Sequence, residues 1–172
     1  MKILFSFLLT TALAFSASAQ GKLPSVKLKD LEGNTFDTKD LLQHDGPIIV
    51  NFWATWCSPC KRELNTIHED YIDWQAETNV KLVAVSIDDE KTKNQVSVYA
   101  NGKGWDYLVL LDPNGDFKRA MGVGNPPHTF VIDKDGTIVY SHNNYAPGDE
   151  HELHQAVVDL HNKQKKPANN KK

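Results

Sequence analysis

The 172-residue sequence predicts an α/β fold in which a sheet lies between helices. The first indication is the segment 48–53, which is apolar apart from Asn51 and is typical of a strand covered on both faces. The second is a change in hydrophobic spacing after Cys57, where apolar residues recur at helical intervals and predict a helix over residues 58–75. The third is the alternation of strands and helices along the remaining chain, which ends in a hairpin and indicates an α/β sandwich.

The other elements follow from the same periodicities and from the turn residues between them. A hairpin is expected over residues 26–36, turning at Glu32-Gly33-Asn34, and either Asp37 or Thr38 can cap a short helix through Leu41 and Leu42. The remaining predicted elements are strands at 80–87, 107–111, 129–132 and 137–140, and helices at 91–100, 117–121 and 149–161.

Residues 1–19 have the pattern of a secretory signal peptide. Lys2 supplies a positive charge, residues 3–14 are largely apolar, and Ala17-Ser18-Ala19 provides small residues that predict cleavage after Ala19. The apolar stretch is shorter than the about 20 residues that span a membrane, although an uncleaved anchor remains an alternative. We therefore expect one periplasmic or secreted domain over residues 20–162 and a disordered polar tail over residues 163–172.

The charge of the chain argues against one class of partner. The formal net charge is −3, and no basic groove is evident in the sequence. Binding to nucleic acid without sequence specificity needs a positive field that displaces counterions from phosphate. We therefore expect no nucleic-acid partner.

The two cysteines of the chain both lie in the tetrapeptide Cys57-Ser58-Pro59-Cys60. A helix N-terminus stabilises a thiolate, and a spacing of three residues places the second sulfur one turn along, facing the interior. This pattern predicts a redox-active pair with Cys57 as nucleophile and Cys60 as resolving cysteine. Two alternatives are a purely stabilising cross-link, which so short a loop makes weak, and a copper or zinc site with His128 as third ligand.

The segment Asn51-Phe52-Trp53-Ala54-Thr55-Trp56-Cys57-Ser58-Pro59-Cys60 resembles the active-site segment of the thioredoxin superfamily, in particular its exported TlpA/ResA/CcmG-like branch. Residues 83–88 and 127–133 also match strands of that family in order. The resemblance implies a thioredoxin-like three-layer sandwich with a central mixed sheet and helices on both faces.

The resemblance also implies an activity and its partners. It implies a thiol-disulfide oxidoreductase that needs no cofactor or metal, acts as a monomer, and reduces the disulfides of client proteins. Cytochrome c maturation and copper-site assembly are the implied settings, with a membrane thiol-disulfide reductase as electron donor. The alternatives are a disulfide oxidase or isomerase, and a copper-binding chaperone that uses Cys57, Cys60 and His128.

Several site residues are carried over from the resemblance. Pro127 corresponds to the family's cis-proline, and Pro126 before it departs from the family because it has no N–H to offer a substrate. The implied substrate groove comprises Trp56, Ser58, Pro59, Pro126 and Pro127.

Glu63 matches an acidic position of the ResA-like branch and lies one helical turn beyond Cys60. We hypothesise that it is partly buried and exchanges a proton with Cys60. The alternative is a solvated helix carboxylate.

Overall fold

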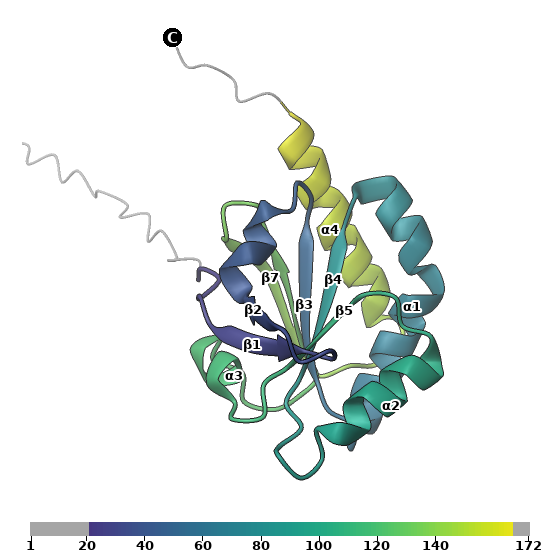
Figure 1. The fold of residues 1–172 in the computed structure, drawn as a ribbon. Helices are drawn as coiled ribbons and strands as arrows, with labels where there is room; N and C mark the ends of the chain where they lie inside the picture. Colours follow the sequence, from purple (N-terminus) through teal and green to yellow (C-terminus); the bar gives the residue numbers. More distant parts are fainter. Residues whose placement is uncertain (1–20, 167–172) are drawn as a thin grey trace, which may run out of the picture.

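The computed structural model describes residues 21–166, which form a seven-stranded sheet with helices on both sides (Figure 1). The strand order across the sheet is β2-β1-β5-β4-β3-β6-β7. The strands are β1 (Lys27–Asp30), β2 (Thr35–Asp37), β3 (Ile48–Trp53), β4 (Lys81–Ser86), β5 (Leu108–Leu111), β6 (His128–Ile132) and β7 (Ile138–Asn143). The helices are the 3₁₀ helix η1 (Thr38–Gln43), α1 (Ser58–Thr78), α2 (Asn94–Lys103), α3 (Asp116–Ala120) and α4 (Asp149–Lys165).

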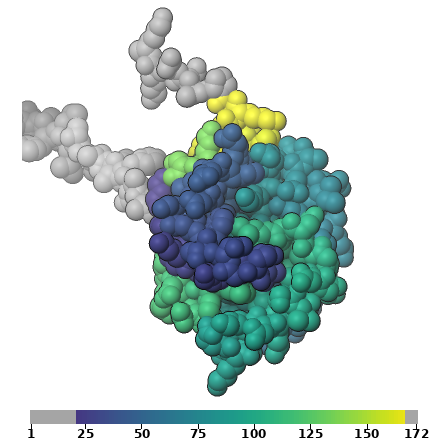
Figure 2. All heavy atoms as spheres, viewed as in Figure 1, coloured from purple at the N-terminus to yellow at the C-terminus, as the bar shows by residue number. Residues whose placement is uncertain are grey.

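The sheet is mixed, as expected. Strands β3, β4 and β5 run parallel to one another, whereas β6 pairs antiparallel with both β3 and β7. The N-terminal hairpin β1–β2 joins the sheet through antiparallel pairing of β1 with β5. Figure 2 shows this purple hairpin at the surface beside the blue η1. The central strand β3 is buried along its whole length, which agrees with its nearly continuous apolar sequence.

The side chains on the two faces of the sheet belong to two separate hydrophobic cores. Ile49 and Trp53 face the core formed with α1, α2 and α4, whereas Val50 and Phe52 face the core formed with η1 and α3. Successive side chains of a strand point to opposite faces, so β3 contributes residues to the core on each side of the sheet. Figure 1 shows α1 and α4 on the side of the sheet opposite α3. The expected three-layer architecture is therefore confirmed.

The boundaries of helices α1 to α4 differ from those expected by one to four residues. Helix α1 continues to Thr78, whose hydroxyl donates to the carbonyl of Trp74, and ends at Asn79 in the left-handed conformation. Helix α2 begins three residues later than predicted because the carboxylate of Asp89 accepts hydrogen bonds from the turn before it. Helix α4 extends to Lys165, so residues 163–165 of the expected tail are helical.

Two predictions fall at the ends of the chain. The signal peptide predicted at residues 1–19 and residues 167–172 of the predicted tail lie outside the described residues. Over residues 21–166, no helix combines the length and the apolar character needed to span a membrane.

Candidate active site

The Cys57-Ser58-Pro59-Cys60 segment lies after β3, at the start of α1. Cys57 is the N-cap residue of the 21-residue helix α1, and its Sγ accepts a hydrogen bond of 3.3 Å from the backbone N–H of Cys60. Pro59 lies in the first helical turn, where no intrahelical N–H is required. The two cysteines form a disulfide with their Cα atoms 5.3 Å apart. The sequence pattern therefore places both sulfurs at a helix N-terminus.

The residues of this segment differ in their access to solvent. Cys60 is fully buried, whereas Cys57 is 6% exposed and is flanked by exposed Ser58 and by Trp56, which is 60% exposed. Trp53, by contrast, lies in the core against the ring of Trp105. A partner approaching from solvent therefore meets Trp56 and Ser58 first, and Cys57 before Cys60.

The loop that leads into Cys57 is anchored by a buried carboxylate. Asp88, only 1% exposed, accepts hydrogen bonds from the backbone N–H and the hydroxyl of Thr55, at 2.8 and 2.5 Å, and from the hydroxyl of Ser86 at 2.8 Å. A buried carboxylate is tolerated when its oxygens are satisfied in this way. Asp88 thereby ties the end of β4 to the loop before the disulfide, a role that the sequence did not reveal.

The peptide bond between Pro126 and Pro127 is cis, the geometry implied by the resemblance. Strand β6 starts immediately afterwards, and the pairing of His128 with Phe52 places this bond beside the end of β3 that leads to Cys57. Pro127 is buried, whereas Pro126 is partly exposed and lines the same cavity as Trp56. Pro126 is therefore the proline of the pair that reaches this cavity.

Glu63 is buried, with 3% of its surface exposed, so it is not the solvated carboxylate considered as the alternative. The hydroxyl of Thr129 donates to its Oε1 at 2.6 Å, and Nδ2 of Asn51 donates to its Oε2 at 2.9 Å. Burial raises the pKa of Glu63 from 4.5 to about 7, although these two hydrogen bonds act in the opposite direction. Glu63 can therefore change protonation state near neutral pH.

Asn51 can serve both protonation states of Glu63. Its Nδ2 donates to Glu63 and to the hydroxyl of Thr129, at 2.9 and 2.7 Å, while its buried Oδ1 has no hydrogen-bond partner among the described residues. A half-turn of the amide exchanges a donor for an acceptor, which a protonated carboxyl requires. Sequence reasoning did not identify Thr129 as part of this group. The sequence signal that was available is that Thr129, like Asn51, is a polar residue within an otherwise apolar strand.

His128 does not form a metal site with the two cysteines. Its Nε2 lies 2.9 Å from the hydroxyl of Ser141, and its ring stacks on Phe130 at 4.2 Å between centroids. Burial lowers the pKa of His128. Over residues 21–166, no group of three or more His, Cys, Asp or Glu side chains is arranged to hold a metal ion. The ligand set of Cys57, Cys60 and His128 considered for a copper site is therefore not formed in this structure.

Comparison with known proteins is consistent with this site. A family model described as Redoxin matches residues 18–157. The chain is 34% identical over 116 residues to the thiol-disulfide oxidoreductase ResA of Bacillus thuringiensis strain Al Hakam, covering 67% of this chain and 64% of that protein. It is also 34% identical over 128 residues to ResA of Geobacillus thermodenitrificans, covering 74% and 68%. The thiol:disulfide interchange protein DsbE of Yersinia pestis is 35% identical over 122 residues, covering 70% and 61%. The chain thus spans just under two thirds of the Bacillus thuringiensis relative.

Solved structures share the fold. An uncharacterized thioredoxin-like protein from Porphyromonas gingivalis is 50% identical and superposes with a TM-score of 0.73, covering 82% of this chain and 92% of that one. A putative thiol:disulfide interchange protein DsbE from Chlorobium tepidum has a TM-score of 0.72 at 23% identity, covering 85% and 99%. The thioredoxin-like architecture expected from the sequence is therefore confirmed.

Proposed function

The chain belongs to the Redoxin family, and from this membership and the cysteine geometry we propose that it is a thiol-disulfide oxidoreductase working through Cys57 and Cys60. The observation that carries the proposal is the position of the Cys57 sulfur at the N-terminus of α1, where it accepts the N–H of Cys60. Unpaired N–H groups and the helix dipole at that position stabilise an anion. The reduced protein would therefore hold Cys57 as the attacking thiolate.

The proposed reaction is a thiol-disulfide exchange in two steps. The Cys57 thiolate attacks one sulfur of a client disulfide, forms a mixed disulfide, and releases the second client sulfur as a thiolate. Cys60 then loses its proton and attacks the sulfur of Cys57, which frees the client. The client gains two electrons, and the protein is left with the Cys57–Cys60 disulfide.

We propose that Glu63 accepts the proton that Cys60 loses in the second step. Glu63 follows Cys60 by one turn of α1, it is buried, and its pKa is raised to about 7 by burial. A carboxyl group with such a pKa can accept and return a proton at neutral pH. Thr129 and Asn51 hold this carboxyl in place through their hydrogen bonds.

The proposed substrate groove comprises Trp56, Ser58, Pro59, Pro126 and Pro127. In support, Trp56 and Ser58 are exposed next to Cys57, and Trp56 and Pro126 line one cavity. Pro126 has no backbone N–H, so an extended client cannot receive a hydrogen bond there. Side-chain contacts should consequently contribute more to client selection than strand-like pairing.

For the direction of exchange we propose reduction of client disulfides. Apocytochromes c and copper-site assembly factors are the proposed clients, a membrane thiol-disulfide reductase is the proposed electron donor, and the protein is proposed to act as a monomer. The names of the ResA and DsbE relatives agree with disulfide exchange without fixing its direction. An oxidase or isomerase is the competing function with the same residues.

The redox potential distinguishes these functions. We expect equilibration with glutathione to give about −200 to −270 mV, the range of glutaredoxins and thioredoxin. A reductant needs a low redox potential because its own disulfide must be more stable toward reduction than the disulfide of the client. A value above about −150 mV would rule out the reductant and favour the oxidase or isomerase.

Export forms a further part of the proposal and rests on the sequence pattern of residues 1–19. We expect the mature protein to begin at Gln20 and to be recovered from the periplasm or the medium. N-terminal sequencing of the protein from each cell fraction tests this. A chain that retains Met1 and remains with the membranes would indicate the uncleaved anchor instead.

A further inference from the structure

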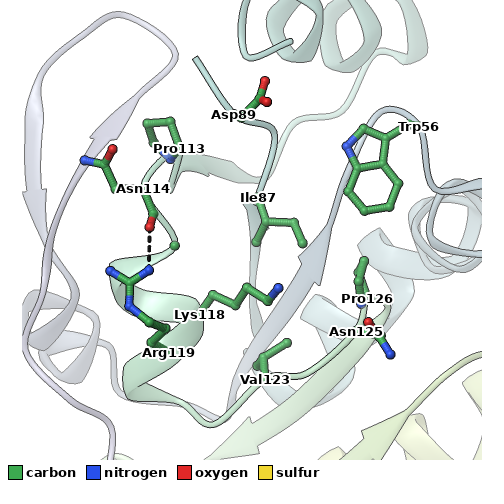
Figure 3. Close-up of a pocket in the computed structure, with 11 residues that line it drawn as sticks. Trp56, Ile87, Asp89, Pro113, Asn114, Lys118, Arg119, Val123, Asn125 and Pro126 are labelled. Atoms are coloured by element: carbon green, nitrogen blue, oxygen red, sulfur yellow. Dashed lines mark hydrogen bonds between the residues drawn. The ribbon is translucent and has the colours of Figure 1, made fainter. Parts of the chain in front are cut away.

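A cavity of about 590 Å³ is lined by residues from four separate segments, one of which is Trp56, the residue before Cys57 (Figure 3). Trp56, adjacent to Cys57, and Pro126, the first residue of the cis peptide bond, lie on one side of it. Helix α3 lies on the other side and contributes Lys118 and Arg119. A client chain whose cysteine lies at Cys57 therefore has room to place a neighbouring side chain here.

The charged groups of this cavity are not equally available. Arg119 donates to Asp116 Oδ1 at 2.5 Å and to the carbonyl of Asn114 at 2.6 Å. Asp89 Oδ1 accepts from the backbone N–H groups of Lys91 and Thr92, at 2.9 and 3.1 Å. The ammonium of Lys118 has no hydrogen-bond or ion-pair partner within residues 21–166. Lys118 is therefore the cation of this cavity that is free to pair with an incoming group.

Lys118 projects from a firmly held base. Both oxygens of Asp112 accept from the backbone of α3, at 3.3 Å from Phe117 N and 2.8 Å from Lys118 N. The ring of Phe117 is fully buried and lies 5.2 Å from that of Phe52. In Figure 3 the Lys118 side chain extends from α3 across the cavity toward the side where Pro126 lies. The backbone position of Lys118 is thus set by the packing of α3 on the sheet.

One part of the cavity wall around Lys118 is apolar, while Asp89, Asn114 and Asn125 line other parts of the cavity. Ile87, Val123 and Pro126 line the cavity around it, and the exposed ring of Trp56 closes one side. An ion pair formed between apolar walls is screened less by water than one on an open surface. A carboxylate reaching Lys118 would gain this attraction, whereas an ammonium group would be repelled.

We propose that this cavity selects client segments that carry an acidic side chain close to the reactive cysteine, with Lys118 as the specificity-determining residue. The inference rests on the proposed function, because it concerns the substrate of the same disulfide exchange. The carboxylate takes no part in the bond changes. It holds the client while the Cys57–client bond forms and the second client sulfur leaves.

The test uses reduced protein and short peptides that carry one cysteine capped as an S-methyl disulfide. Each peptide has Glu, Gln or Lys at successive positions on either side of the cysteine. We expect Glu to exceed Gln in second-order rate constant by about three- to fivefold at one or more positions, the effect of a partly exposed ion pair. Lys118→Gln should bring this ratio to about one, and Lys118→Glu should favour Lys instead.

Lys134→Gln is the matched control, since it removes an exposed lysine at the β6–β7 turn, at the end of β6 remote from Pro127. It should keep the wild-type preference. Equal rates for Glu and Gln peptides at every position, or a preference that survives in Lys118→Gln, overturns the inference while leaving the proposed function intact. Failure of the reduced wild type to react with any peptide or with glutathione disulfide overturns the proposed function, and this inference with it.

Discussion

Replacement of Cys57 by serine is expected to lower the rate of disulfide exchange by at least about a thousandfold, because a serine hydroxyl is not ionised near neutral pH. The sulfur that the change removes is the one at the N-cap of α1, next to exposed Trp56 and Ser58. The measurements are turbidimetric insulin reduction and the reaction of the reduced protein with glutathione disulfide. Activity close to that of the wild type would exclude Cys57 as the nucleophile.

Cys60→Ser is the matched variant, because it leaves the attacking sulfur and removes the resolving one. It should react once with a client disulfide and then remain attached to the client as a mixed disulfide, which non-reducing electrophoresis and mass spectrometry detect. The protein trapped in this way identifies the client directly. If Cys57→Ser instead accumulated the mixed disulfide, the two roles would be reversed.

The stability of the two variants is measured alongside their activity. Either substitution removes the same disulfide, whose short loop contributes about 2 kcal/mol to the free energy of unfolding in the chain-entropy model. The two sites differ in burial, since Cys60 is fully buried whereas Cys57 is the N-cap of α1, so the urea midpoint of each variant is compared with that of the reduced wild type. A difference in activity between them then reflects chemistry at one sulfur.

The features predictable from the sequence are those that depend on local pattern. The buried run at β3 and the helical spacing after Cys57 each follow from neighbours in the chain, so their types were correct and only the end of α1 was misplaced. The same holds for the cysteine pair, since Cys57 and Cys60 are brought together by one helical turn.

Other features depend on contacts between distant segments, which periodicity does not encode. Thr129 reaches Glu63 across 66 residues, and Asp88 reaches Thr55 across 33. Both contacts follow from the pairing of β3 with β6 and with β4, a register set by the assembled sheet. The cavity at Lys118 likewise exists only because α3 packs beside the cis-proline segment. Sequence reasoning consequently identified Glu63 but not the residues that hold it.

Protonation of Glu63 should make the stability of the protein depend on pH. In the unfolded chain this carboxyl has an ordinary pKa near 4.5, whereas burial raises it to about 7 in the folded protein. Between these two values the folded protein holds a proton that the unfolded chain has released. The free energy of unfolding attributable to Glu63 is therefore fully present below pH 4.5 and falls as the pH rises toward 7, by about 3 kcal/mol in total.

Glu63→Gln removes this dependence because glutamine does not titrate. Its amide can be accommodated if Asn51 turns its unpartnered Oδ1 toward it, so the variant is expected to fold. The measurement is urea unfolding of the wild type and the variant from pH 4.5 to 8. The difference in free energy of unfolding, variant minus wild type, should rise by about 3 kcal/mol across this range, because the variant lacks the carboxyl group whose pKa is raised by burial.

The control is Glu69→Gln, an exposed carboxylate on the same helix, for which this difference should stay within about 0.5 kcal/mol. Parallel unfolding curves for Glu63→Gln and the wild type at every pH would show that Glu63 does not titrate in this window. The same variants test proton transfer: alkylation of Cys60 in the reduced protein should follow a different pH profile in Glu63→Gln. If the profile is unchanged while the stability difference appears, Glu63 is a buried titrating group that takes no part in the exchange, because a proton acceptor for Cys60 must alter when that thiol ionises.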